Sequence, residues 1–302
     1  MPSSDKKLSV QWGHKKRAPC DMSRGSATTD GRFAYFTPSG SASVYRYEWD
    51  SEKWSQLPSC PSLDSGLVII DRELTAVGGY AANDSTWPRM VSTDKLHTLR
   101  LWRWVEKHPP MNTAHISPAV VSTPEYLIVI GGGSHTIHSF QPSEWISTVE
   151  LYHLKTRSWH YLTSLPQPLT LPSATICGDQ LNVIGDYTEG YTCSLQTIPH
   201  GGKPIPSSLA LSWKPLPPLP VTQATAATVC GQLVIFRGGS SVNSIHQLVD
   251  GQWVEISSIG YSRLGCLVAN RSPEEVVIVG GCGVVNGLIQ TVNTVEKCII
   301  TK

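Results

Sequence analysis

The sequence has no apolar run long enough to cross a membrane and no strong charge of either sign. A bilayer span needs about 20 consecutive apolar residues, and here the hydrophobic residues, 40% of 302, fall in short runs. The N-terminus, Met1–Lys7, lacks the apolar core of a secretory signal. The formal net charge of +1 gives no overall attraction to nucleic acid or to an anionic membrane. We therefore expect a cytoplasmic protein that binds neither.

Clustered cysteines are also missing. The chain contains no C-x-x-C pair, and its cysteines are widely spread: Cys20, Cys60, Cys177, Cys193, Cys230, Cys266, Cys282 and Cys298. A disulfide framework or a zinc site needs tighter clustering, whereas a reduced cysteine packs well as a small apolar residue. Reduced thiols inside strands are the expected state.

Recognisable catalytic motifs are absent. The sequence has no G-x-S-x-G elbow, no G-x-x-x-x-G-K-[ST] loop and no H-E-x-x-H. Its paired glycines precede no helix, so a nucleotide-binding interpretation fails on context. His135 and His138 lie near Glu144, but an exposed polar loop is favoured over a metal site there because no further ligand is apparent. We expect no cofactor, no metal and no enzymatic activity.

What the chain does contain is a repeated strand pattern. The apolar run Glu125–Ile130 leads into Gly131-Gly132, a second strand follows at Thr148–Leu154, and Trp159 lies on the next. No apolar period of 3.6 extends over a dozen residues, so the pattern indicates an all-β protein. A search for internal repeats is therefore the first step.

Tryptophans mark the copies of this pattern, at steps between 40 residues (253 − 213) and 55 residues (159 − 104). The tryptophans are Trp12, Trp54, Trp104, Trp159, Trp213 and Trp253. Proline-marked turns follow most of them, at Pro58, Pro109-Pro110, Pro166 and Pro217. Apolar strands then run into glycines, at Gly78-Gly79, Gly131-Gly132, Gly185, Gly238-Gly239 and Gly280-Gly281.

This order of features resembles the kelch repeat, whose period is about 50 residues. The resemblance covers nearly the whole chain and implies that each copy is a four-stranded antiparallel blade of a β-propeller. Blades pack face to face, which explains inner strands that are apolar on both faces. The glycines allow a sharp backbone turn, and the tryptophan supplies an apolar plate between blades.

The chain ends indicate how the ring closes. The final copy stops at Thr294–Ile300 without a tryptophan strand, whereas Leu8–Trp12 is a tryptophan strand with no blade before it. Together they predict a single six-bladed domain over residues 1–302, whose last blade is closed by a strand at residues 8–14 so that no sheet edge stays free. The predicted blades span residues 22–60, 61–111, 112–167, 168–220, 221–259 and 260–302. Residues 83–89 and 134–144 are expected to be loops between second and third strands, and residues 199–206 interrupt the fourth blade.

The resemblance implies a protein-interaction module, because kelch proteins that recruit partners bind them at one mouth of the channel. Two kinds of position contribute: the residue after the double glycine, and a residue leading into the first strand of a blade. Carried over by motif, these positions are Tyr80, Ser240, Tyr187, Arg24, Arg263, His115 and Gln223. Two arginines at one mouth favour a carboxylate or phosphate, so an acidic peptide is the expected partner. Blade packing by the tyrosine and carbonyl binding by the arginines are the competing structural roles.

Three alternatives stay open. Some kelch-like propellers are enzymes, such as galactose oxidase and the sialic acid mutarotase type, which makes a sugar- or small-molecule-active propeller the second hypothesis. Cytoskeletal binding is a third use of the fold. A flanking partner domain of the BTB kind has no match here, so the propeller either acts alone, as a monomer, or is part of a longer chain with a scaffold or substrate-recognition role.

Overall fold

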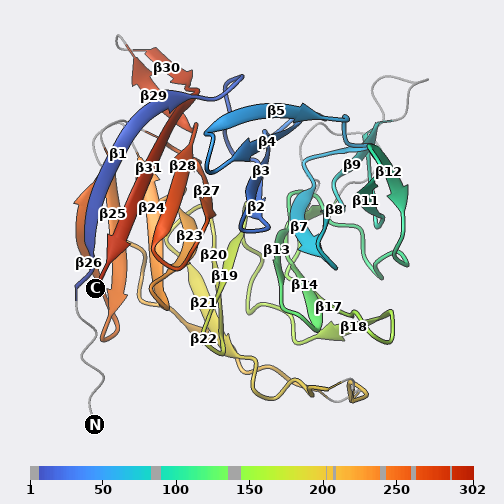
Figure 1. The fold of residues 1–302 in the computed structure, drawn as a ribbon. Coiled ribbons are helices and arrows are strands. Elements are labelled where there is room, and N and C mark those ends of the chain that lie inside the picture. Colours follow the sequence, from blue (N-terminus) through green and yellow to red (C-terminus); the bar gives the residue numbers. More distant parts are fainter. Residues whose placement is uncertain are drawn as a thin grey trace.

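Antiparallel strands account for all the regular structure in the computed structural model, which describes residues 7–82, 90–134, 144–201, 203–206, 209–238, 243–259, 263–285 and 288–302. These residues form six four-stranded sheets and three smaller ones. Figure 1 shows the large sheets arranged side by side around a common centre. No helix in this part of the chain is long and apolar enough to cross a bilayer.

Each of the first three blades runs from an inner strand outward in chain order. Blade 1 consists of β2 (Ser26–Thr29), β3 (Phe33–Thr37), β4 (Val44–Glu48) and β5 (Lys53–Leu57). Blade 2 consists of β7 (Gly66–Ile70), β8 (Glu73–Val77), β11 (Leu96–Arg100) and β12 (Arg103–Glu106). Blade 3 consists of β13 (Ala119–Ser122), β14 (Tyr126–Ile130), β17 (Val149–His153) and β18 (Ser158–Leu162).

The next two blades repeat this order, and the last one departs from it. Blade 4 consists of β19 (Ser173–Cys177), β20 (Gln180–Ile184), β21 (Gly190–Ser194) and the short β22 (Lys214–Pro215). Blade 5 consists of β23 (Thr225–Val229), β24 (Gln232–Gly238), β25 (Asn243–Val249) and β26 (Gln252–Ser258). Blade 6 consists of β27 (Leu267–Asn270), β28 (Glu275–Val279), β31 (Thr294–Thr301) and β1 (Ser9–Arg17).

The N-terminal strand closes the ring, as the sequence predicts. Strand β1 pairs antiparallel with β31, from Ser9 opposite Thr301 to Arg17 opposite Thr294. It is longer than the predicted 8–14 and contains an irregularity between Trp12 and Lys15. Because the first and last strands share one sheet, unfolding the N-terminus removes the outer strand β1 from blade 6, and unfolding the C-terminus removes the strand with which β1 pairs.

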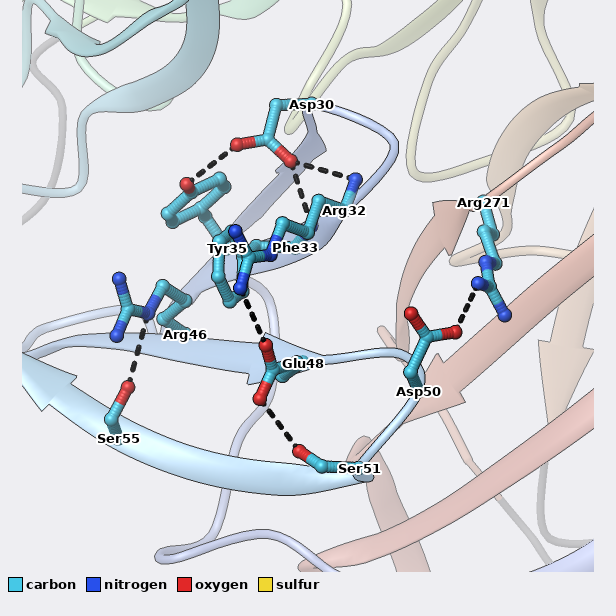
Figure 2. A network of polar contacts seen from close by, with 10 residues as sticks. All are labelled: Asp30, Arg32, Phe33, Tyr35, Arg46, Glu48, Asp50, Ser51, Ser55 and Arg271. Atoms are coloured by element: carbon cyan, nitrogen blue, oxygen red, sulfur yellow. Dashed lines mark hydrogen bonds and ion pairs between the residues drawn. The ribbon is translucent and has the colours of Figure 1, made fainter.

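Ion pairs join blade 6 to blade 1 across this closure. Arg271, in the turn between β27 and β28, pairs with Asp50 in the turn between β4 and β5, and Lys16 of β1 pairs with Glu52 of the same turn. Figure 2 shows Asp50 and Arg271 facing each other from the two blades, with the Arg32–Glu48 pair on blade 1 beside them. These pairs are at the surface, where each contributes about 0–1 kcal/mol.

The apolar core lies on the central strands of the blades. All five side chains of β14 are buried, whereas the outer strand β12 has three exposed and one half-buried. A fully buried Leu, Ile or Val contributes about 1.5–3 kcal/mol as an upper estimate. None of the eight cysteines forms a disulfide, and Cys60, Cys193, Cys266 and Cys298 are buried.

Tryptophan and proline, the two markers of the repeat, meet in one recurring hydrogen bond. The indole N–H of Trp104 donates to the carbonyl of Pro58 at 2.9 Å, and that of Trp159 donates to Pro109 at 3.0 Å. Trp213 and Trp253 bond Thr163 and Pro217 in the same way. Each of these tryptophans therefore anchors its blade to the turn that follows the preceding blade.

The double glycine, after the second strand of a blade, packs against the chain that leads into the inner strand of its own blade and of the next one. Gly132 has a φ of +88°, and a Cβ atom there would lie 2.4 Å from the carbonyl oxygen of Ile116. Gly79 donates its N–H to the carbonyl of His115 at 2.7 Å, so the chain leading into blade 3 rests directly on the glycines of blade 2. Only glycine fits such a close approach at a positive φ.

Three small sheets extend beyond the glycine pairs. They are β6 (Ser62–Leu63) with β9 (Tyr80–Ala82) and β10 (Met90–Ser92), β15 (Gly133–Ser134) with β16 (Glu144–Trp145), and β29 (Cys282–Val285) with β30 (Leu288–Thr291). The predicted loops at 83–89 and 134–144 fall largely outside the described residues. The segment at 199–206 lies between β21 and β22, that is, between the third and fourth strands of blade 4.

Candidate interaction site at the channel mouth

Six equivalent residues ring one end of the channel. Each is the second residue before the inner strand of its blade, and each has a φ between +42° and +63°. These rim residues are Arg24, Asp64, Ser117, Leu171, Gln223 and Gly265. Arg24 donates its backbone N–H to Gly265 at 2.8 Å, and Ser117 donates to Asp64 at 2.8 Å, so rim residues of different blades are held together by backbone hydrogen bonds.

All six rim residues line a cavity of ≈ 160 Å³ together with residues of the inner strands. Its polar side chains include Arg24 from blade 1, Asp186 from the end of β20 and Gln223 from blade 5. Arg24 is exposed, whereas Asp186 and Gln223 are half-buried. The mouth therefore offers a cation, a carboxyl and an amide in one depression.

Asp186 is the polar group most affected by this setting. Burial raises the pKa of its carboxyl, and the Arg24 charge and a 3.5 Å hydrogen bond from the Gln223 amide act against that rise. Gln223 also donates its backbone N–H to the Asp186 carbonyl at 2.7 Å. The carboxyl is thus fixed beside Gln223, with Arg24 close enough to stabilise its charge.

The second carboxylate at the rim serves the fold. Asp64 Oδ1 accepts hydrogen bonds from the Ser39 hydroxyl at 2.8 Å and from the Gly40 N–H at 2.7 Å. These bonds hold the turn between β3 and β4 of blade 1 against blade 2. Tyr80, the residue after Gly78-Gly79, is only 5% exposed, and burial followed by the Asp64 charge raises its pKa to about 12. Its position agrees with the competing packing role.

His115 lies two residues before the rim and is wholly buried. Its Nδ1 is 2.7 Å from the Gly131 carbonyl, and its Nε2 is 3.3 Å from Glu150 Oε1. Glu150 also accepts the N–H groups of Asn112 and Thr113. Burial alone would raise the pKa of this carboxyl, but the bonds from His115 and Asn112 outweigh burial and lower it.

Arg263 occupies the same place in blade 6, also 0% exposed. Its Nη1 donates to the carbonyls of Gly280 at 3.2 Å and Thr294 at 2.8 Å, and its Nη2 is 3.1 Å from Glu296 Oε2. His115 and Arg263 therefore have the same structural role in their blades. Each binds the carbonyl of the first residue of the double glycine and a buried glutamate on the third strand. The prediction that they lie at the mouth is wrong, because it placed Arg263 level with Arg24, whereas Gly265 is the residue of blade 6 that is equivalent to Arg24.

The remaining predicted residues divide as follows. Tyr187, directly after Asp186, is 62% exposed, and Arg24 and Gln223 belong to the rim itself. Ser240 lies outside the described residues, as do His135 and His138. Within the described ranges, no three His, Cys, Asp or Glu side chains are grouped to hold a metal.

Sequence reasoning missed Asp64, Ser117, Leu171 and Asp186. Asp186 had a signal, because it stands where the pattern expects a second glycine. The other three had only their position, two residues before an apolar strand, since their side chains have nothing in common.

Six four-stranded sheets around a channel, with a double glycine and an anchoring tryptophan in the repeat, define a β-propeller. Comparisons with known proteins agree. The Kelch motif family matches residues 117–166, which include all four strands of blade 3. The Kelch-like protein terF of Aspergillus terreus (strain NIH 2624 / FGSC A1156) is 21% identical over 199 residues, covering 65% of this chain but only 43% of terF.

A solved structure of the protein YjhT superimposes with a TM-score of 0.73 at 14% identity, covering 95% of this chain and 99% of YjhT. At that identity the likeness concerns the fold alone. The chain is a β-propeller whose third blade matches the Kelch motif.

Proposed function

We propose that this propeller is a non-enzymatic protein-interaction module that binds its partner at the rim of the channel. The observation that supports this is the convergence of Arg24, Asp186 and Gln223, from three different blades, in the lining of one depression, with the exposed Tyr187 directly after Asp186. An exposed tyrosine and arginine are the residue types that contribute most to protein interfaces. Three of the carried-over positions, Tyr80, His115 and Arg263, are buried and are not part of the proposed surface.

The partner chemistry follows from Arg24. Among the described residues that line the cavity, Arg24 is the one with a positively charged side chain. We therefore propose that its guanidinium binds one carboxylate of an extended, acidic peptide segment. Asp186 beside it requires a donor, so the same segment would place a hydroxyl or amide next to the carboxylate. This narrows the expected acidic partner to a mixed acidic and polar one, because Asp186 repels a run of carboxylates.

A scaffold or substrate-recognition role in a larger protein is part of the same proposal. The aligned region makes up less than half of terF, which is consistent with a propeller that serves as one part of a longer protein. The rim would then select the partner, and other segments would act on it.

Affinity capture with the intact chain and three variants tests the proposal. Arg24→Ala and Tyr187→Ala should lose a partner that the wild-type protein retains. Arg32→Ala is the matched control, because Arg32 is a surface arginine that pairs with Glu48 away from the rim (Figure 2). Equal melting temperatures would show that all variants fold. Equal capture by all four proteins would refute a binding site at the rim.

One observation favours a second function, a sugar- or small-molecule-active propeller. Asp186 combines a raised carboxyl pKa with a position in the cavity lining, which is a common property of general acids and bases. NMR spectra of monosaccharides would reveal binding or accelerated exchange between anomers. An effect lost in Asp186→Asn would favour this function, and no effect with any sugar would exclude it for the compounds tried.

A further inference from the structure

The turn between β11 and β12 carries two apolar residues in an unfavourable backbone conformation. Leu101 is 99% exposed and Trp102 is 60% exposed, and their φ angles are +45° and +67°. Arg100 pairs with Arg103, which makes this a two-residue hairpin turn. Such turns favour Asn-Gly because both residues need a positive φ. Leucine and tryptophan there are strained as well as exposed, a combination that points to a role outside folding.

Guanidinium groups without a counterion flank this Leu101–Trp102 tip. Arg103 follows Trp102 and is exposed, and Arg72 lies in the neighbouring turn between β7 and β8. Neither takes part in an ion pair among the described residues. The tip therefore presents an apolar point beside uncompensated positive charge, at the end of the molecule opposite the rim.

A groove of complementary character lies beside it on the same end. It lies between blades 2 and 3 and has a volume of ≈ 380 Å³. Ile69, Ile70, Pro124 and Leu154 supply its apolar lining, and Asp71 borders it with a side chain that is 61% exposed. Since a cavity of about 150 Å³ accepts a benzene ring, this groove has room for an indole.

We propose that the Leu101–Trp102 tip of one molecule docks into the groove of a second copy of this chain. A two-fold symmetric interface requires tip and groove on one face, so that each copy supplies both, and the two features lie on adjacent blades at one end. Arg103 of each copy would meet Asp71 of the other. The proposal does not depend on the function of the rim, which stays free at the far end of both copies.

The charges on this end favour a second copy over a membrane. Asp71, in the turn between β7 and β8 beside the tip, is 61% exposed, and its contact with Lys107 of the same chain is long, at 3.8 Å. An anionic bilayer would repel this carboxylate, whereas it is the group that a symmetric partner's arginine needs. Burial of two small tips also implies a weak dimer, formed only at raised protein concentration.

Analytical ultracentrifugation of the intact chain is the test. The weight-average mass should rise from 32.9 kDa toward twice that value as the concentration increases. Leu101→Asn/Trp102→Gly should stay monomeric throughout and melt at the same or a higher temperature, because Asn-Gly suits the turn. Leu288→Asn, which removes another exposed leucine (64%) from the β29–β30 hairpin, should associate like the wild-type protein.

Charge reversal separates this interface from unspecific association. Arg103→Glu and Asp71→Arg should each fail to self-associate, because each homodimer would bring like charges together twice. An equimolar mixture of the two should associate again, because both contacts then join opposite charges.

Three outcomes would overturn the proposal. They are a wild-type protein that is monomeric at every concentration, a tip variant that associates as the wild-type protein does, and charge variants whose mixture stays monomeric. Binding of the monomeric wild-type protein to anionic vesicles, lost in the tip variant, would assign the tip to a membrane instead.

Discussion

Replacement of Arg263 by methionine should destabilise the propeller far more than any surface arginine variant. The guanidinium is wholly buried, bonds the carbonyls of Gly280 and Thr294, and lies 3.1 Å from Glu296, itself 2% exposed. Methionine fills much of the volume but leaves the buried Glu296 carboxylate without the Arg263 guanidinium. Breaking a buried pair from one side costs about 3–5 kcal/mol. For 302 residues this corresponds to a fall in Tm of about 5–8 °C.

Urea unfolding followed by tryptophan fluorescence measures the loss. Addition of Glu296→Gln to Arg263→Met should recover part of it, because no buried charge then remains, whereas Arg32→Ala should cost at most about 1 kcal/mol. The reasoning is refuted if Arg263→Met costs less than about 1 kcal/mol, or if Glu296→Gln makes the double variant worse. The result also matters for binding studies, since an Arg263 variant that fails to capture a partner would report misfolding.

Two further predictions concern contacts of blade 3. Gly132→Ala should cost about 2–4 kcal/mol, because the new Cβ would clash with the Ile116 carbonyl. Gly31→Ala, at the same φ of +88° but with nothing within 4 Å, should cost only about 1–2 kcal/mol; equal losses by chemical denaturation would show that the close approach is unimportant. The second prediction concerns pH. The pKa of Glu150 is lowered on folding, so its stabilisation is complete above the unfolded value of about 4.3 and is lost as pH falls through the folded pKa. The excess stability of the wild-type protein over Glu150→Gln should therefore shrink in acid, and a constant difference from pH 7 to pH 2 would contradict this.

The sequence predicts the architecture because each blade depends on local patterns that can be recognised within a single copy of the repeat. The apolar run of β14, the glycines after it and the indole of Trp159 each do in the structure what their residue types imply. Ring closure was also predictable, since Leu8–Trp12 and Thr294–Ile300 are each incomplete alone. These features involve burial and backbone conformation, which residue type strongly constrains.

The rim was harder to predict because its residue types vary. The residues at the six equivalent positions are Arg, Asp, Ser, Leu, Gln and Gly. Of these types, only glycine indicates a positive φ in the sequence. Packing of neighbouring blades imposes that conformation on whatever residue stands there. Alignment of Arg263 with Arg24 was therefore wrong by two residues. As a result, the buried Arg263 was predicted to lie at the exposed rim.

Backbone strain has different meanings at the two ends of the propeller. At the rim a positive φ recurs in all six blades, with residues of every chemical type, so it belongs to the architecture and says nothing about binding by itself. At the opposite end, the hairpin turn of blade 5 uses Asp250-Gly251, which suits its φ angles of +47° and +75°, whereas the equivalent turn of blade 2 uses Leu101-Trp102. The fold accepts a favourable turn at this position, so the fold does not require the unfavourable one. Positive φ angles also occur at this end at Glu52, Asp71, Arg72, Arg157 and Cys230, but among the described residues only Leu101 and Trp102 combine such a φ with an exposed apolar side chain. That combination is the one that selection for an interface would leave.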